Sequence, residues 1–111
     1  MKSGVNKIKK YILLVLFLSI GISADKFLLI DVRTPNEFEL GHIEDSFNIE
    51  WENISSILTN SKKDKKIYLY CRSGRRSQKA TEILLDLGYK DVTNLGGINE
   101  ASKVLNKKII K

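Results

Sequence analysis

The sequence predicts an α/β fold, a central parallel sheet of about four strands flanked by helices. Apolar runs of strand length alternate along the chain with segments of helical pattern. The first of these runs is apolar almost without interruption, which is typical of strands buried on both faces of a parallel sheet. The 111 residues leave room for one domain. The predicted strands are 27–32, 47–49, 67–70 and 92–94.

The first 24 residues differ in composition from the rest of the chain. They contain four lysines, no acidic residue and an apolar run of twelve residues from Tyr11 to Ile22. A bilayer span needs roughly 20 apolar residues, and the small residues at 23–24 suit a cleavage site. We therefore expect a signal peptide over 1–24, a domain over 25–111, and export to the periplasm or another extracytoplasmic compartment. An uncleaved membrane anchor is the alternative.

The net charge of +6 depends largely on this leader. Its removal leaves 15 basic against 13 acidic residues, a net charge of +2. The densest basic run, 62–66, contains no aromatic residue, so the chain lacks the basic stripe of a nucleic-acid-binding protein. We expect no nucleic-acid partner, and no stable membrane association once the leader is cleaved.

Three helices are indicated around the strands. Thr34-Pro35-Asn36-Glu37 fits a capping box with proline at the first helical position, and Gly41 is expected to end that helix. A weaker helical pattern covers 51–58. A stronger one has apolar residues at i, i+3, i+4 and i+7 and ends near Gly88. These residues are Ala80, Ile83, Leu84 and Leu87.

The end of the chain has a weaker pattern. Gly96 and Gly97 are expected to form a tight turn close to the edge of the sheet where ligands bind. Ala101, Val104 and Leu105 then suggest a final helix, which we expect to fray into the lysine-rich tail.

The only cysteine, Cys71, stands where the third strand ends and a short loop leads into the next helix. The carboxyl edge of an open α/β sheet is where ligands bind. A helix amino terminus and the cations Arg72, Arg75 and Arg76 favour a thiolate and attract anions. Gly74 allows successive N–H groups to point inward. The alternative is a small buried apolar cysteine that closes a core strand.

Three segments carry a resemblance to a known family. The segment 71–76, Cys-Arg-Ser-Gly-Arg-Arg, resembles the C-x-x-G-x-R active-site loop of rhodaneses. Residues 28–33 with 37–38, 41–43 and 48–49 resemble the first motif of that family, and 88–89, 92 and 95–97 its last motif. The match covers nearly all of the chain after residue 25. The chain resembles most the single-domain periplasmic rhodaneses, such as those of the phage-shock operon. It departs from the family at Asp45, Ser46 and Glu50.

The resemblance implies a sulfurtransferase without a metal or organic cofactor. Cys71 would attack the outer sulfur of thiosulfate, release sulfite, hold a persulfide and pass the sulfur to cyanide or a thiol. The N–H groups of the loop from Arg72 to Arg76, which includes Ser73 and Gly74, would cradle the persulfide. Arg76 matches the family arginine and would bind the sulfonate oxygens; Arg72 and Arg75 are assigned the same role by charge.

Supporting roles also follow from the resemblance. Asp31 and Arg33 would hold the loop from below, although an ordinary surface ion pair is the alternative. His42 would belong to a structural turn, and a catalytic Cys71–His42 pair is the alternative.

Two other functions remain open from the sequence. One is a module that carries or binds sulfur without fast turnover. The other is a cysteine-dependent phosphatase or arsenate reductase of the same fold. The loops of those enzymes read C-x5-R, which would require arginine at position 77, where this chain has Ser77.

Overall fold

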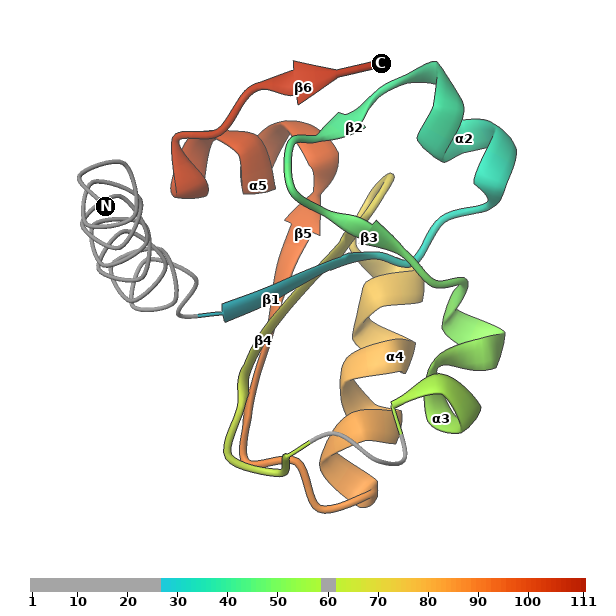
Figure 1. Ribbon diagram of the computed structural model, residues 1–111, viewed down its shortest axis with the longest axis vertical. Coiled ribbons are helices and arrows are strands. Elements are labelled where there is room, and N and C mark those ends of the chain that lie inside the picture. The colour runs from blue at the N-terminus through green and yellow to red at the C-terminus, as the bar shows by residue number, and fades with distance from the viewer. Residues whose placement is uncertain (1–26, 59–61) are drawn as a thin grey trace, which may run out of the picture.

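The computed structural model describes residues 27–58 and 62–111, so the expected signal peptide lies outside the described residues. Within these ranges the core is a four-stranded sheet in the order β3-β1-β4-β5, and all neighbouring strands are parallel (Figure 1). The predicted α/β fold with a parallel sheet is confirmed. The strands are β1 (Phe27–Asp31), β3 (Phe47–Asn48), β4 (Lys66–Cys71) and β5 (Asp91–Gly97).

The register between β4 and β5 changes near the carboxyl end of the sheet. Leu69 lies opposite Asn94, but Cys71 lies opposite Gly97, so β5 contains one extra residue in this interval. Such a bulge bends a strand and redirects its side chains. The tight turn expected at Gly96 and Gly97 is therefore wrong, because both glycines belong to the end of β5.

Helices cover both faces of the sheet, as Figure 1 shows. On one face α4 (Arg75–Asp86) packs with a 3-10 turn, η1 (Trp51–Asn53), and α3 (Ile54–Ile57). The other face is covered by α5 (Ile98–Leu105). Because alternate residues of the strands enter two different cores, β1 and β4 must be apolar on both sides. No helix in the described ranges is long and apolar enough to cross a membrane.

The helix α2 (Pro35–Leu40) begins as its sequence predicts. Thr34 Oγ1 accepts a hydrogen bond from Glu37 N at 3.3 Å, and Glu37 Oε1 accepts one from Thr34 N at 3.1 Å. This is the reciprocal arrangement of a capping box. Gly41 follows the helix, and its N–H donates to the carbonyl of Phe38.

The carboxyl-terminal tail is ordered into a strand, so the expected fraying of α5 into the tail is wrong. Asn106 adopts a left-handed conformation with φ 52° and ends α5. The chain then turns back, and β6 (Ile109–Ile110) pairs antiparallel with β2 (His42–Ile43), as Figure 1 shows. Lys107 Nζ reaches Asp45 at 3.0 Å beside this pair.

Candidate active site

Cys71 is the last residue of β4 and lies at the carboxyl edge of the sheet, as expected. Gly74 N donates a hydrogen bond to Cys71 Sγ at 2.9 Å, and Ser77 Oγ lies 3.4 Å from the same sulfur. Cys71 is 0% exposed and packs within the core on the α4 face. The side chains and backbone around the loop therefore cover the sulfur in this structure.

Gly74 is required by the conformation of the loop. Its φ is 95°, in the left-handed region that side chains disfavour. A Cβ atom at this position would also lie 3.2 Å from Gly96 Cα. Glycine thus permits both the turn that aims the N–H at sulfur and the close approach of β5.

The surroundings of the sulfur act on its ionisation in opposite directions. Burial raises the pKa of Cys71. Hydrogen bonds from the Ser77 hydroxyl and from the backbone N–H groups of Ser77, Ser73 and Gly74 lower the pKa, and together they outweigh burial. The net pKa lies below that of an ordinary cysteine. The first turn of α4 contains no acidic residue that would oppose the positive end of the helix. Since the thiolate is the nucleophilic form, the geometry suits covalent catalysis by Cys71.

Ser77 is a site residue that sequence reasoning used only to exclude a phosphatase loop. It is the third residue of α4 and is fully buried against the sulfur. Backbone N–H groups in the first turn of a helix have no partner within the helix. That rule could have identified Ser77 once the helix was placed after the loop.

Arg72 and Arg75 are exposed, whereas Arg76 is partly buried and paired. Arg76 Nη1 donates to Glu37 Oε1 at 2.7 Å and Arg76 Nη2 to Glu37 Oε2 at 3.0 Å. The pair joins the start of α4 to α2. The hydrogen bond from Arg76 is the main reason that the pKa of Glu37 falls to about 2, with burial opposing it and Thr34 assisting. Sequence reasoning assigned Glu37 to the helix cap and to the first family motif, but to no contact with Arg76.

Asp31 and Arg33 form a buried pair, not a surface one. Arg33 Nη2 donates to Asp31 Oδ2 at 2.7 Å and to the carbonyl of Gly41 at 2.6 Å. Arg33 is 7% exposed and Asp31 0%. Asp31 lies opposite Tyr70, the residue before Cys71, so the pair braces the strand end that carries the cysteine.

His42 contacts the helix that precedes it. Its Nδ1 lies 2.8 Å from the carbonyl oxygen of Phe38, and its ring stacks on the Phe38 ring at a centroid distance of 3.7 Å. The hydrogen-bonded neighbours of Cys71 Sγ in the described chain are Gly74 and Ser77. These contacts support the structural role expected for His42.

Asn94 of β5 was missed by the sequence analysis. Its Oδ1 accepts hydrogen bonds from Ser77 Oγ at 2.6 Å and from Gly96 N at 2.9 Å, while its Nδ2 donates to the carbonyl of Gly74 at 3.0 Å. Asn94 thus connects β5 to the loop and to α4. A polar residue near the carboxyl end of a predicted strand was the available signal.

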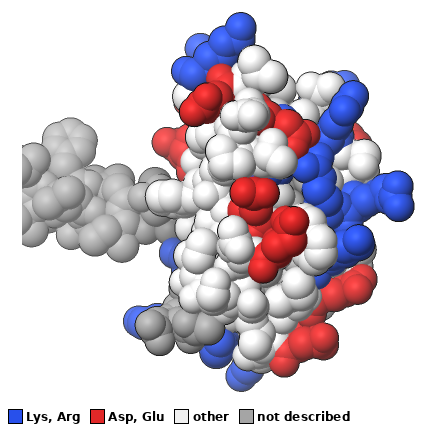
Figure 2. All heavy atoms as spheres, turned by 90° about the vertical axis from the view of Figure 1, so that its right-hand side faces the viewer, with Lys and Arg blue, Asp and Glu red and all other residues white. Residues whose placement is uncertain are grey.

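Charge is unevenly distributed over the surface. Figure 2 shows one face on which Lys and Arg side chains form a column beside a group of Asp and Glu. On the loop and the first turns of α4, the exposed cations are Arg72, Arg75 and Lys79. An open hollow next to them is lined by Ser73, Gly74, Arg75 and Asn94, among others. An anion therefore meets several cations near the cysteine.

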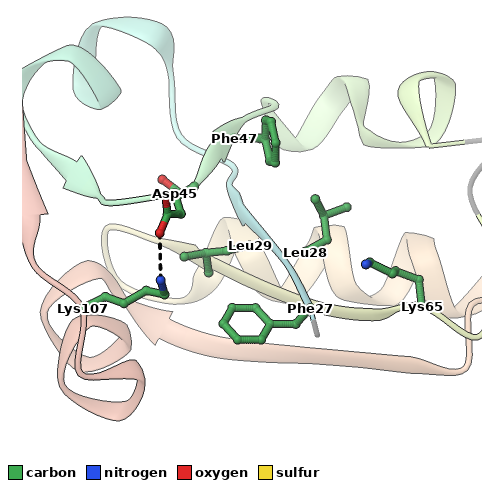
Figure 3. A pocket seen from close by; sticks show the side chains of 8 residues that line it. Phe27, Leu28, Leu29, Asp45, Phe47, Lys65 and Lys107 are labelled. Atoms are coloured by element: carbon green, nitrogen blue, oxygen red, sulfur yellow. Dashed lines mark hydrogen bonds and ion pairs between the residues drawn. The ribbon is translucent and has the colours of Figure 1, made fainter. Parts of the chain in front are cut away.

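A second hollow lies at the opposite end of the sheet. Figure 3 shows it beside β1 and β3, where Phe27, Leu28 and Phe47 are among the residues that line it and Lys107 pairs with Asp45. The lining contains no cysteine or histidine. Cys71 and the loop that follows it lie at the other, carboxyl edge of the sheet.

Comparison with known protein families gives a match over most of the chain. The family described as "Rhodanese-like domain" matches residues 18–103. The chain is 34% identical over 73 residues to thiosulfate sulfurtransferase PspE of Escherichia coli, covering 64% of this chain and 70% of that protein. It is 35% identical over 95 residues to adenylyltransferase and sulfurtransferase UBA4 of Candida albicans, covering 78% of this chain and 22% of that protein.

This chain is also 39% identical over 83 residues to a mitochondrial protein of Schizosaccharomyces pombe whose name describes it as a thiosulfate sulfurtransferase. The match covers 63% of this chain. The chain spans 58% of that relative.

Solved structures give the same match. A structure described as a rhodanese with anions from E. coli superposes with a TM-score of 0.67 at 31% identity, covering 76% of this chain and 96% of that one. The solution structure of hp1203 from Helicobacter pylori has a TM-score of 0.62 at 30% identity, covering 78% and 79% of the two chains.

Proposed function

This chain belongs to the family of rhodanese-like domains, and we propose that it is a thiosulfate sulfurtransferase in which Cys71 carries the sulfur. The observation that carries the proposal is the pair of donors at Cys71 Sγ, with Gly74 N at 2.9 Å and Ser77 Oγ at 3.4 Å. The backbone N–H groups of Ser77 and Ser73 act in the same direction on the pKa of the thiol. Relatives named as thiosulfate sulfurtransferases support the substrate.

The reaction divides into two transfers. The Cys71 thiolate attacks the outer sulfur of thiosulfate, the sulfur–sulfur bond of thiosulfate breaks, and sulfite leaves with the bonding electron pair. A persulfide remains on Cys71, and its negative charge lies where the loop N–H groups can donate to it. Cyanide or a thiolate then attacks the outer sulfur, and the Cys71 thiolate is regenerated. The charges balance in both steps without an external oxidant.

The arginines have different positions in this scheme. Arg72 and Arg75 are exposed and are available to attract the dianion. Arg76 is held by Glu37, so the predicted contact between Arg76 and the sulfonate requires the substrate to share or displace that carboxylate. Access to the buried sulfur and a change at this ion pair are thus expected to accompany binding.

Two alternative functions are distinguished by the product. A sulfur carrier would form the persulfide without rapid transfer to a small acceptor. The similarity to proteins named adenylyltransferase and sulfurtransferase, of which this chain spans only a part, is the observation that favours this alternative. A phosphatase would need an arginine where the buried hydroxyl of Ser77 faces the sulfur. The geometry therefore favours sulfur transfer over phosphate transfer.

We also propose that residues 1–24 direct export and are removed, which places the enzyme in the periplasm or an equivalent compartment. The composition of the leader supports this proposal. Expression in a bacterium followed by intact-mass measurement of the exported protein tests it, because cleavage would give a chain that begins at Asp25. A full-length chain in the membrane fraction would instead indicate an anchor.

The direct test of activity is cyanide-dependent formation of thiocyanate from thiosulfate. We expect turnover by the unaltered protein and none by Cys71→Ser, with circular dichroism confirming that the variant is folded. An aryl phosphate serves as the control substrate. Hydrolysis of the phosphate without thiocyanate formation would overturn the proposal.

A further inference from the structure

Ser77 stands between two groups that compete for its single hydroxyl hydrogen. Its Oγ lies 2.6 Å from Asn94 Oδ1 and 3.4 Å from Cys71 Sγ, and Ser77 is 0% exposed. A serine hydroxyl has one hydrogen to donate and two lone pairs to accept with. Burial excludes a water molecule that could replace either partner. The hydrogen therefore goes either to the amide oxygen or to the sulfur.

The orientation of the Asn94 amide is determined by its other contacts. Asn94 Nδ2 donates to the carbonyl of Gly74 at 3.0 Å and to Gln78 Oε1 at 3.2 Å. Gly96 N donates to Asn94 Oδ1 at 2.9 Å. A rotated amide would set its NH₂ group against Gly96 N–H and its oxygen against the carbonyl of Gly74. The oxygen of Asn94 consequently faces Ser77 as an acceptor.

The preferred direction of the hydroxyl then depends on the state of the cysteine. With a thiol, Ser77 donates to Asn94, and its free lone pair can accept the S–H of Cys71. With a thiolate, the sulfur is an acceptor only, and the hydroxyl gains by turning to donate to it. Turning leaves Asn94 Oδ1 with Gly96 N as its one remaining donor among the described contacts.

We propose that Asn94 is a positioning residue for Cys71 that acts through Ser77. While Cys71 is a thiol, Asn94 Oδ1 accepts the Ser77 hydrogen, which leaves the Ser77 oxygen free to accept the S–H. When the sulfur becomes charged, the Ser77 hydrogen leaves Asn94 Oδ1 and is donated to the sulfur. The inference rests on the proposed function only in taking Cys71 as the reacting sulfur. It adds to the backbone N–H groups of the loop and α4 a hydroxyl donor, Ser77, whose orientation is controlled by Asn94 of β5.

Other charged groups also face this region from the elements packed around it. Their contribution is common to all of the variants below, so it cancels in a comparison among them. The groups are Arg76 with Glu37 of α2, Asp31 of β1 with Arg33 of the loop that follows it, and Glu100 of α5, which accepts a hydrogen bond from Gly97 N.

The test is a double-variant cycle read out by the pKa of Cys71. Because the chain has one cysteine, the pH dependence of its alkylation by iodoacetamide reports this thiol alone. Ser77→Ala removes a donor and should raise the pKa. Asn94→Ala frees the Ser77 hydroxyl. The pKa shift that Asn94→Ala causes should therefore be more negative when Ser77 is present than in the Ser77→Ala background. The difference should be about half a pKa unit, a threefold change in ionisation.

Matched variants separate this role from a structural one. Gln78→Ala removes a neighbour of Asn94 Nδ2 but leaves the Ser77 contact, and should not move the pKa. Asn94→Asp keeps an acceptor at Oδ1 and should give coupling of the opposite sign; it also replaces Asn94→Ala if that variant fails to fold. Equal shifts in the two backgrounds would overturn the proposal. Alkylation of Cys71 needs no sulfur donor. A protein that forms no thiocyanate would therefore contradict the proposed function without deciding the role of Asn94.

Discussion

At the scale of the residue, Cys71 combines complete burial with a lowered pKa. Burial alone would favour the neutral thiol. Hydrogen bonds from the Ser77 hydroxyl and from the N–H groups of Ser77, Ser73 and Gly74 reverse that preference. In the proposed reaction the same donors would face a persulfide that extends from Sγ, so one arrangement would serve both the nucleophile and the intermediate.

The arginines of the loop should differ in how they affect kinetics. We expect Arg72→Ala and Arg75→Ala to raise the KM for thiosulfate roughly threefold to tenfold with little change in kcat, because they attract the dianion. Arg76→Ala should raise KM and also lower kcat, because it releases Glu37 beside the loop. Steady-state kinetics at low ionic strength, with Lys90→Ala as a control, measure this. Unchanged KM values in all three variants would refute the role of charge.

At the scale of the element, the site is the junction of β4 and α4, held in place by β5. The extra residue of β5 brings Asn94 and Gly96 against the loop, where Asn94 binds Gly74 and Ser77. The Arg76–Glu37 pair then ties the same junction to α2. Two elements distant in sequence from each other, β5 and α2, thus help to determine where the loop N–H groups point.

Two glycines offer a matched pair for testing the loop. Gly74 and Gly88 have φ values of 95° and 96°, but a Cβ at Gly74 would meet Gly96 at 3.2 Å, whereas at Gly88 it would meet nothing within 4 Å. Each alanine variant should lose about 1 kcal/mol through the left-handed conformation. Only Gly74→Ala should lose more and reduce kcat at least roughly tenfold, by displacing an N–H donor. Urea unfolding and thiocyanate assays measure both; equal kcat values would contradict the prediction.

The Arg76–Glu37 pair should make stability depend on pH. The pKa of Glu37 is lowered from 4.5 to about 2 by Arg76, with burial opposing and Thr34 assisting. Because the folded pKa is depressed, this stabilisation is present above pH 4.5 and is lost as pH falls toward 2. Glu37→Gln should reduce the free energy of unfolding by about 1 to 2 kcal/mol at neutral pH, an amount limited by partial exposure.

Urea unfolding at a series of pH values follows this difference. It should shrink as the solution approaches pH 2, where the carboxylate of the unaltered protein becomes protonated. Glu39→Gln on the same helix is the control. A difference that stayed constant over this range would show that the ion pair does not stabilise the fold.

At the scale of the whole molecule, the carboxyl-terminal tail, residues 107–111, packs against the segment around β2, which is distant from it in sequence. Ile109 and Ile110 pair with Ile43 and His42, and Lys107 reaches Asp45. Removing residues 107–111 should lower the free energy of unfolding by about 1 to 2 kcal/mol, with kcat unchanged. Removing Lys111 alone is the control. A fall in kcat without a change in stability would show that the tail acts on the site instead.

The sequence predicted those features whose signals are local. Strand β4, the helix after it and the place of Cys71 at the carboxyl edge of the sheet follow from runs of residues and from one cysteine. The contacts of Ser77 with Asn94 and of Arg76 with Glu37 were missed, because they join residues 17 and 39 positions apart. The strands β2 and β6 were missed because two residues are too few to show a period of two.

The measurement that bears most directly on the account is the intact mass of the protein after incubation with thiosulfate. We predict a gain of one sulfur atom on the unaltered chain, its loss on addition of cyanide, and no gain in Cys71→Ser. A sulfur retained after cyanide would indicate a carrier instead of an enzyme. An unaltered chain that gained no sulfur would contradict the claim that Cys71 is an activated nucleophile for thiosulfate.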